Sequence, residues 1–170
     1  MIAATATKSA KQQFLEAFER ETATTIKVLK AYPEDQSELR PQEKMKTARE
    51  LAAMFTMEMA AIDAAVRGTF TFPPRLPPMP QNWKEVVEAF EKTRAHTLEG
   101  LREVTEESLA SGSISFPTAP KTVSPWQKLP FAWFLLFDQI HHRGQLSVYL
   151  RLAGGKLPSI YGPTADEPWT

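Results

Sequence analysis

The stretch from Phe131 to Gly155, FAWFLLFDQIHHRGQLSVYLRLAGG, carries ionisable side chains within an otherwise apolar segment. Asp138 and His142 are four residues apart, and in a helix this spacing places both side chains on the same face. A carboxylate and an imidazole on an apolar face are costly to bury unless they are paired, hydrogen-bonded or bound to a metal. The spacing therefore indicates either an internal ion pair or part of a metal site.

A metal bound at this pair needs one or two further ligands, which Glu58, His141, Gln145 or water could supply. Glu58 lies in a second apolar segment and shares an inward-facing stripe with Leu51, Phe55, Ile62 and Val66. His141 is rotated by about 100° from His142 on a regular helix, so the two cannot easily point into one site. Glu58 is thus the candidate from a different part of the chain.

Periodic apolar residues between capping signals predict four helices, at residues 7–32, 47–67, 83–110 and 129–153. Thr47 with Glu50 and Asn82 with Glu85 have the spacing of a capping box at two of the starts. Proline-rich connections at 68–81 and 111–128 must be extended rather than helical. We therefore expect an all-α fold with little or no strand: an up-up-down-down four-helix bundle with long crossover loops.

Composition limits the classes of function. A chain of 170 residues with 42% hydrophobic content fits one domain, residues 1–170. Twenty basic and twenty acidic residues give a formal net charge of zero, which provides no field that favours nucleic acid or an anionic membrane. The longest apolar run, Phe131–Phe137, falls short of the roughly 20 residues needed to span a bilayer, and the N-terminus lacks a hydrophobic signal core. We expect a cytoplasmic protein.

The chain has no cysteine, which excludes disulfides, thiolate metal ligands and a cysteine nucleophile. Any thiol chemistry therefore requires a thiol cosubstrate.

The string from His141 to Glu167, HHRGQLSVYLRLAGGKLPSIYGPTADE, resembles the C-terminal part of the DinB-like (DinB/YfiT) family of small metal-binding helical proteins. The order of the predicted elements upstream is similar to that of the same family. The resemblance implies a four-helix bundle with a divalent metal at its centre. In the family this metal usually has three histidine ligands: one from the second helix, and two from a His-x-x-x-His pair that precedes Arg-Gly-Gln.

This sequence departs from that pattern. His142 matches the last histidine ligand, but the position four residues earlier is Asp138, and the second-helix position falls at about Met54. A carboxylate is an ordinary ligand for zinc or nickel, whereas a thioether is a poor one. Glu58 lies one turn beyond Met54, and we expect it to replace the missing ligand.

The resemblance implies a protein with a central pocket and a divalent zinc or nickel site, acting as a metal-dependent hydrolase or thiol transferase on a small-molecule substrate. Arg143, Gln145 and Tyr149 are candidate substrate contacts, although Arg143 could instead pair with an acid from another helix. The alternative function is a metal-free bundle that serves as a binding or dimerisation module. We also expect the Asp138–His142 pair to be buried, and we expect a homodimer because apolar residues surround the last helix.

Overall fold

The computed structural model describes residues 7–74 and 77–170. This part of the chain contains five α-helices and one β-hairpin: α1 (Ala10–Ala31), α2 (Ala48–Arg67), α3 (Trp83–Glu103), α4 (Glu106–Ala110), β1 (Ile114–Ala119), β2 (Thr122–Trp126) and α5 (Lys128–Leu152). A short 3₁₀ turn, Glu34–Gln36, follows α1. The fold is mostly helical, as the sequence predicts. No helix in the described ranges is both long and apolar enough to cross a membrane.

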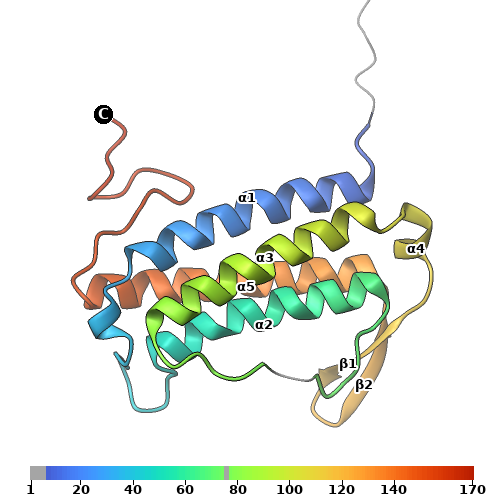
Figure 1. The fold of residues 1–170 in the computed structure, drawn as a ribbon, viewed down its shortest axis with the longest axis horizontal. Coiled ribbons are helices and arrows are strands. Elements are labelled where there is room, and N and C mark those ends of the chain that lie inside the picture. Colours follow the sequence, from blue (N-terminus) through green and yellow to red (C-terminus); the bar gives the residue numbers. More distant parts are fainter. Residues whose placement is uncertain (1–6, 75–76) are drawn as a thin grey trace, which may run out of the picture.

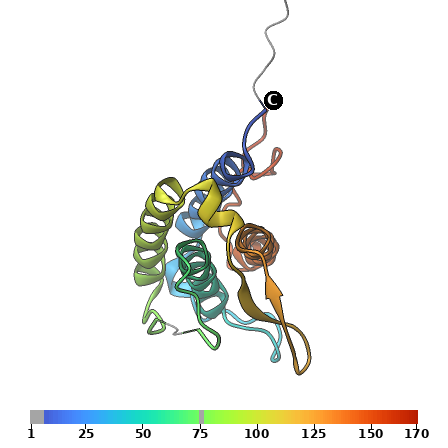
Figure 2. The ribbon, with the colours of Figure 1, turned by 90° about the vertical axis from the view of Figure 1, so that its right-hand side faces the viewer.

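The four long helices pack in a ring (Figures 1 and 2). Helix α2 packs against α3 and α5, and α1 packs against the same two helices from the other side. Helices α1 and α5 run in one direction and α2 and α3 in the opposite direction (Figure 1). The order is therefore up, down, down, up, and the up-up-down-down arrangement expected from the sequence is wrong.

The connections explain this order. The α1–α2 loop turns back at one end of the bundle, where the backbone N–H groups of Ala48 and Arg49 donate to the carbonyls of Leu39 and Ser37. The segment from α3 to α5 turns back at the other end through α4 and the hairpin (Figure 1). The α2–α3 connection instead returns along the bundle, and two of its residues, 75–76, lie outside the described ranges. Its described residues form neither helix nor strand, as its prolines predict.

The predicted capping box is complete at the start of α2, whereas at the start of α3 only the Asn82 side-chain cap forms and the Glu85 carboxylate accepts from the Gln81 N–H instead of the Asn82 N–H. The Thr47 hydroxyl accepts from the Glu50 N–H at 3.1 Å, while the Thr47 N–H donates to the Glu50 carboxylate at 2.8 Å. The Asn82 side chain accepts from the Glu85 N–H at 2.9 Å. Gly68 ends α2 with φ of 75°, a left-handed conformation that favours glycine. Local chemistry therefore fixes where α2 begins and ends.

The region between α3 and α5 differs from the prediction in two ways. Helix α3 ends at Glu103 rather than at about Ala110, because Val104 is extended and Thr105 caps the separate helix α4. The expected loop 111–128 contains the antiparallel hairpin β1–β2. The Phe116 ring of β1 packs on Phe131 of α5, with ring centroids 5.0 Å apart. This long-range packing helps to hold a hairpin that the proline content did not indicate.

The interior of the bundle is filled by large apolar side chains that are fully buried, among them Phe14, Phe18, Phe55, Phe90, Met59 and Leu136. In the described part of the chain, these side chains occupy the bundle centre, where the sequence predicts a pocket. Helix α5 is also less buried than its composition predicts, because Phe137, Val148 and Leu152 on its outer side are exposed. In the ring, α5 packs on α1 and α2, which leaves its outward side uncovered.

Candidate metal centre

Three potential metal ligands meet where α2 faces α5. Glu58 comes from α2, and Asp138 and His142 come from adjacent turns of α5. One ligand atom from each of these residues lies within 4.8 Å of the others. His142 Nε2 is 3.6 Å from Glu58 Oε1 and 3.7 Å from Asp138 Oδ2. These separations are too long for direct hydrogen bonds, so the three side chains lie next to one another without hydrogen-bonding to each other.

The hydrogen bonds of Gln145 determine which nitrogen of His142 is free. His142 Nδ1 lies 3.1 Å from Gln145 Oε1, and the Gln145 amide nitrogen lies 3.0 Å from His141 Nε2. The amide nitrogen carries only donors, so it donates to His141, and the amide oxygen then accepts from His142 Nδ1–H. In neutral His142 the lone pair is therefore on Nε2, which faces the two carboxylates.

Glu58 is the most buried member of the cluster, with a side chain that is only 7% exposed. Among the described residues, neither carboxylate oxygen has a hydrogen-bond partner. Burial and the nearby Asp138 charge raise the pKa of Glu58 to about 9. The nearby Gln139 amide has a smaller, opposite effect and lowers this pKa. The Gln139 side-chain nitrogen itself donates to the Phe55 carbonyl at 3.2 Å. An unpartnered buried carboxyl is costly, and a bound cation would offset that cost.

The donor set fits a divalent metal. One imidazole nitrogen and two carboxylates are ordinary ligands for zinc, and imidazole also suits nickel. With metal–ligand distances of about 2.0–2.1 Å, the ligand atoms of a tetrahedral site lie roughly 3.4 Å apart. The two His142 separations, 3.6 and 3.7 Å, are close to this spacing. Met54, the residue near the second-helix ligand position that the resemblance implies, is partly buried and packs against the core.

The Asp138–His142 pair is less buried than expected. The Asp138 side chain is 40% exposed and that of His142 is 15% exposed. Asp138 lies on a surface-facing part of α5 next to the exposed Phe137, which explains the difference. The cluster is therefore buried on its α2 side and open to solvent beside Asp138.

Arg143 and Tyr149, which the sequence suggested as substrate contacts, use their polar groups inside the protein. The Arg143 guanidinium is buried and donates to the Glu21 carboxylate at 2.8 Å and to the Tyr161 hydroxyl at 2.6 Å. The Tyr149 hydroxyl donates to the Lys46 carbonyl at 2.9 Å. Arg143 thus pairs with an acid from another helix, the alternative left open by the sequence, while Gln145 contacts His142.

The Arg143–Glu21 pair links α1 to α5 and to the C-terminal segment. Burial raises the pKa of the Glu21 carboxyl, but hydrogen bonds from Tyr161 and Arg143 and the Arg143 charge outweigh this effect, so the pKa lies below its ordinary value. Tyr161 donates to the Glu21 carboxylate at 2.6 Å. Glu21 therefore remains ionised in a buried position, and the pair holds the segment after α5 against the bundle.

Residues 17–146 match the family described as the DinB superfamily. This segment includes α2, α3 and the cluster of candidate metal ligands. The chain belongs to the DinB superfamily. The match ends at residue 146, within α5. The residues after Leu146 that resemble the family therefore lie outside the matched segment. This family is associated with metal binding, and the Glu58–Asp138–His142 cluster provides a possible site for it.

Two solved structures are similar to this DinB-superfamily chain. A DinB-like protein from Bacillus cereus ATCC 10987 is 21% identical, with a TM-score of 0.70 over 87% of this chain and 95% of the other. The DinB-like protein YjoA from Bacillus subtilis is 18% identical, with a TM-score of 0.68 over 87% and 96%. At these identities the likeness establishes the fold alone.

Among curated sequences, the uncharacterized protein YrdA of Bacillus subtilis strain 168 is 53% identical over 34 residues. That match covers 20% of this chain and 20% of YrdA.

The sequence indicates the three candidate ligands of this cluster, but not all of the polar groups around them. Gln139 is fully buried, and its side-chain oxygen has no hydrogen-bond partner among the described residues. Gln145, a candidate ligand and substrate contact in the sequence, hydrogen-bonds with His142 in the structure. The spacing of three residues between His142 and Gln145 is the signal that could have indicated this contact.

Proposed function

We propose that this protein binds a divalent zinc or nickel ion through Glu58, Asp138 and His142 and uses it to activate a nucleophile. One observation carries the proposal: the two buried and unpartnered oxygens of Glu58 face the free Nε2 of His142 and the Asp138 carboxylate. Buried polar atoms without partners are rare in folded proteins and call for an explanation. A cation shared by the three side chains provides one.

The chain's own residues would hold and expose such an ion. Gln145 holds the Nδ1 proton of His142 and so keeps Nε2 available as a ligand. Glu58 closes the α2 side, while the half-exposed Asp138 leaves an opening toward solvent. When bound, the ion would lower the pKa of a coordinated water or thiol and so supply a nucleophile near neutral pH.

The reaction class follows from which nucleophile is used. With water the protein is a hydrolase, and with a thiol it is a thiol transferase acting on a small molecule. Because the chain has no cysteine, the thiol must come from a cosubstrate. In either case Gln145 would position His142 through its hydrogen bond to Nδ1.

The test is a zinc and a nickel titration of protein purified without an affinity tag and stripped with EDTA. A ligand that binds only the folded state stabilises it by about 2.7 kcal/mol at a concentration of 100 Kd, so the melting temperature should rise. Glu58→Gln and Asp138→Asn should each weaken this effect. Glu88→Gln, which changes an exposed carboxylate of α3, is the matched control and should leave it unchanged. If neither metal changes the melting curve, the metal-free binding or dimerisation module becomes the better account.

We also propose that the chain forms a homodimer through the outer side of α5. Phe137 is 60% exposed there, and Val148 and Leu152 are exposed to a similar extent. Large apolar side chains gathered on one helix surface favour contact with another protein surface. A second copy of the same helix offers a self-complementary partner under two-fold symmetry.

A further inference from the structure

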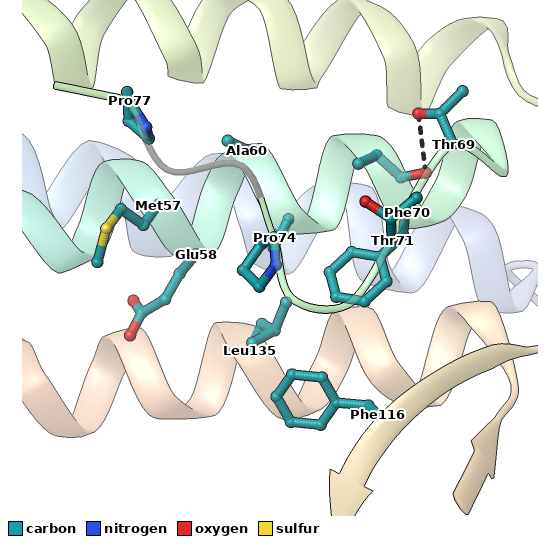
Figure 3. Close-up of a pocket in the computed structure, with 12 residues that line it drawn as sticks. Met57, Glu58, Ala60, Thr69, Phe70, Thr71, Pro74, Pro77, Phe116 and Leu135 are labelled. Atoms are coloured by element: carbon teal, nitrogen blue, oxygen red, sulfur yellow. Dashed lines mark hydrogen bonds between the residues drawn. The ribbon is translucent and has the colours of Figure 1, made fainter. Parts of the chain in front are cut away.

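A cavity of about 410 Å³ lies beside the metal-ligand cluster, between α2, the segment that follows it, β1 and α5 (Figure 3). Its size is within the range of about 300–1,000 Å³ that is usual for small-molecule sites. It is outside the packed interior of the bundle, which is filled by buried aromatic and aliphatic side chains. The cavity shares one residue, Glu58, with the cluster.

Small side chains on α2 leave the space for this cavity. Ala61 and Ala64, three residues apart on one helix face, line it from α2. Phe70 and Phe116 form another part of the wall, with ring centroids 6.2 Å apart, and Pro74 and Leu135 also line it. These positions come from four separate segments, so the cavity exists only in the folded chain.

Glu58 joins the cavity to the cluster. It is both a lining residue of the cavity and a member of the triad with Asp138 and His142. Figure 3 shows its side chain reaching from α2 toward α5. It is more than nine-tenths buried, and its carboxylate oxygens have no hydrogen-bond partner among the described residues. A ligand in the cavity would therefore have one end next to Glu58.

We propose that this cavity receives the substrate of the metal site, and that the substrate has an uncharged, apolar body with its reacting polar group at the Glu58 end. This inference rests on the proposed function. The described lining residues are mostly alanine, proline, phenylalanine and other apolar side chains. An anionic body would lose its hydration here and would lie near the Asp138 carboxylate. An apolar body gains from leaving water and leaves no charge unpaired.

The test uses two probes that share one ring system. N-phenyl-1-naphthylamine is uncharged, and 1-anilinonaphthalene-8-sulfonate is the same molecule with an added sulfonate. Fluorescence titration of the full chain should give saturable binding of one molecule of the neutral probe, at least tenfold tighter than that of the sulfonate. Equal affinity for the two probes, or binding of the neutral probe that does not saturate, would overturn the proposal.

Variants then locate the bound probe. Ala64→Phe fills the cavity from α2 and should weaken binding of the neutral probe at least tenfold. Ala95→Phe, which makes the same change at an exposed position of α3, is the control and should bind as the parent does. Ala61→Leu fills the cavity with a smaller side chain, and its melting curve and that of Ala64→Phe establish that both variants fold. If both folded variants bind the probe as tightly as the parent, the assigned cavity is wrong.

Zinc calorimetry on the same proteins separates this inference from the metal site. Ala64→Phe should keep the zinc affinity of the parent, and Asp138→Asn should lose zinc affinity but bind the neutral probe normally. Absence of zinc binding together with the expected probe selectivity would refute the proposed function and not the ligand class of the cavity. Zinc binding together with unselective probe binding would refute the cavity assignment alone.

Discussion

Replacing Glu58 by glutamine should stabilise the metal-free protein while removing its response to metal. The folded-state pKa of Glu58 is raised from its ordinary value of 4.5 to about 9. Between these values the unfolded chain is ionised at this position and the folded chain is protonated. The folded state therefore binds more protons, and stability must fall as pH rises through this window.

The size of the effect follows from the linkage relation. Each pH unit above 4.5 costs about 1.4 kcal/mol of stability, so at pH 7 the wild-type carboxyl costs about 3 kcal/mol relative to a neutral side chain. Below pH 4.5 both states are protonated and the cost vanishes. Glu58→Gln should thus be about as stable as the parent at pH 4.5 and more stable by about 3 kcal/mol at pH 7.

The assay is urea unfolding of EDTA-treated parent and variant at half-unit steps from pH 4.5 to pH 8. Glu88→Gln serves as the control, because an exposed substitution should change stability by no more than about 0.5 kcal/mol. A constant difference between parent and Glu58→Gln across this range would refute the reasoning, since it would mean that Glu58 is ionised to the same extent in both states. A variant that is less stable than the parent at pH 7 would refute it as well.

Three further outcomes are expected. Arg143→Met leaves the buried Glu21 carboxylate without its ion-pair partner and should lower the free energy of unfolding by about 3–5 kcal/mol, measured by urea unfolding at pH 7. A decrease below about 1 kcal/mol would argue against a buried pair. Phe137→Glu places a charge on the outer side of α5 and should shift the mass measured by light scattering from a dimer to the 19.1 kDa monomer, whereas a parent that is already monomeric would exclude this interface. Gln145→Ala removes the group that accepts the His142 Nδ1 proton and should weaken zinc binding by roughly 10- to 100-fold, measured by calorimetry. An unchanged zinc affinity would show that other contacts orient His142.

Local features of the sequence were sufficient to predict the structure where their effect is confined to one or two helical turns. The Thr47–Glu50 box fixed the start of α2, and Gly68 fixed its end, because each acts on backbone groups within a few residues of itself. The four-residue spacing of Asp138 and His142 brought their side chains within 3.7 Å, since a helix places such positions one above the other. The placement of Glu58 on the inward face of α2 followed from apolar periodicity alone.

Contacts between distant segments were decided only by the tertiary structure. The approach of Glu58 to α5, the pairing of Arg143 with Glu21 and the packing of Phe116 on Phe131 all depend on which helix faces come together. The helix order also depended on where each connection turns, and proline content predicts an extended backbone without fixing its direction. Capping and apolar periodicity act over a few residues and can be recognised in the sequence. The burial of Glu58, its raised pKa and the cavity beside it arise instead from side chains that folding brings together from α2, β1 and α5.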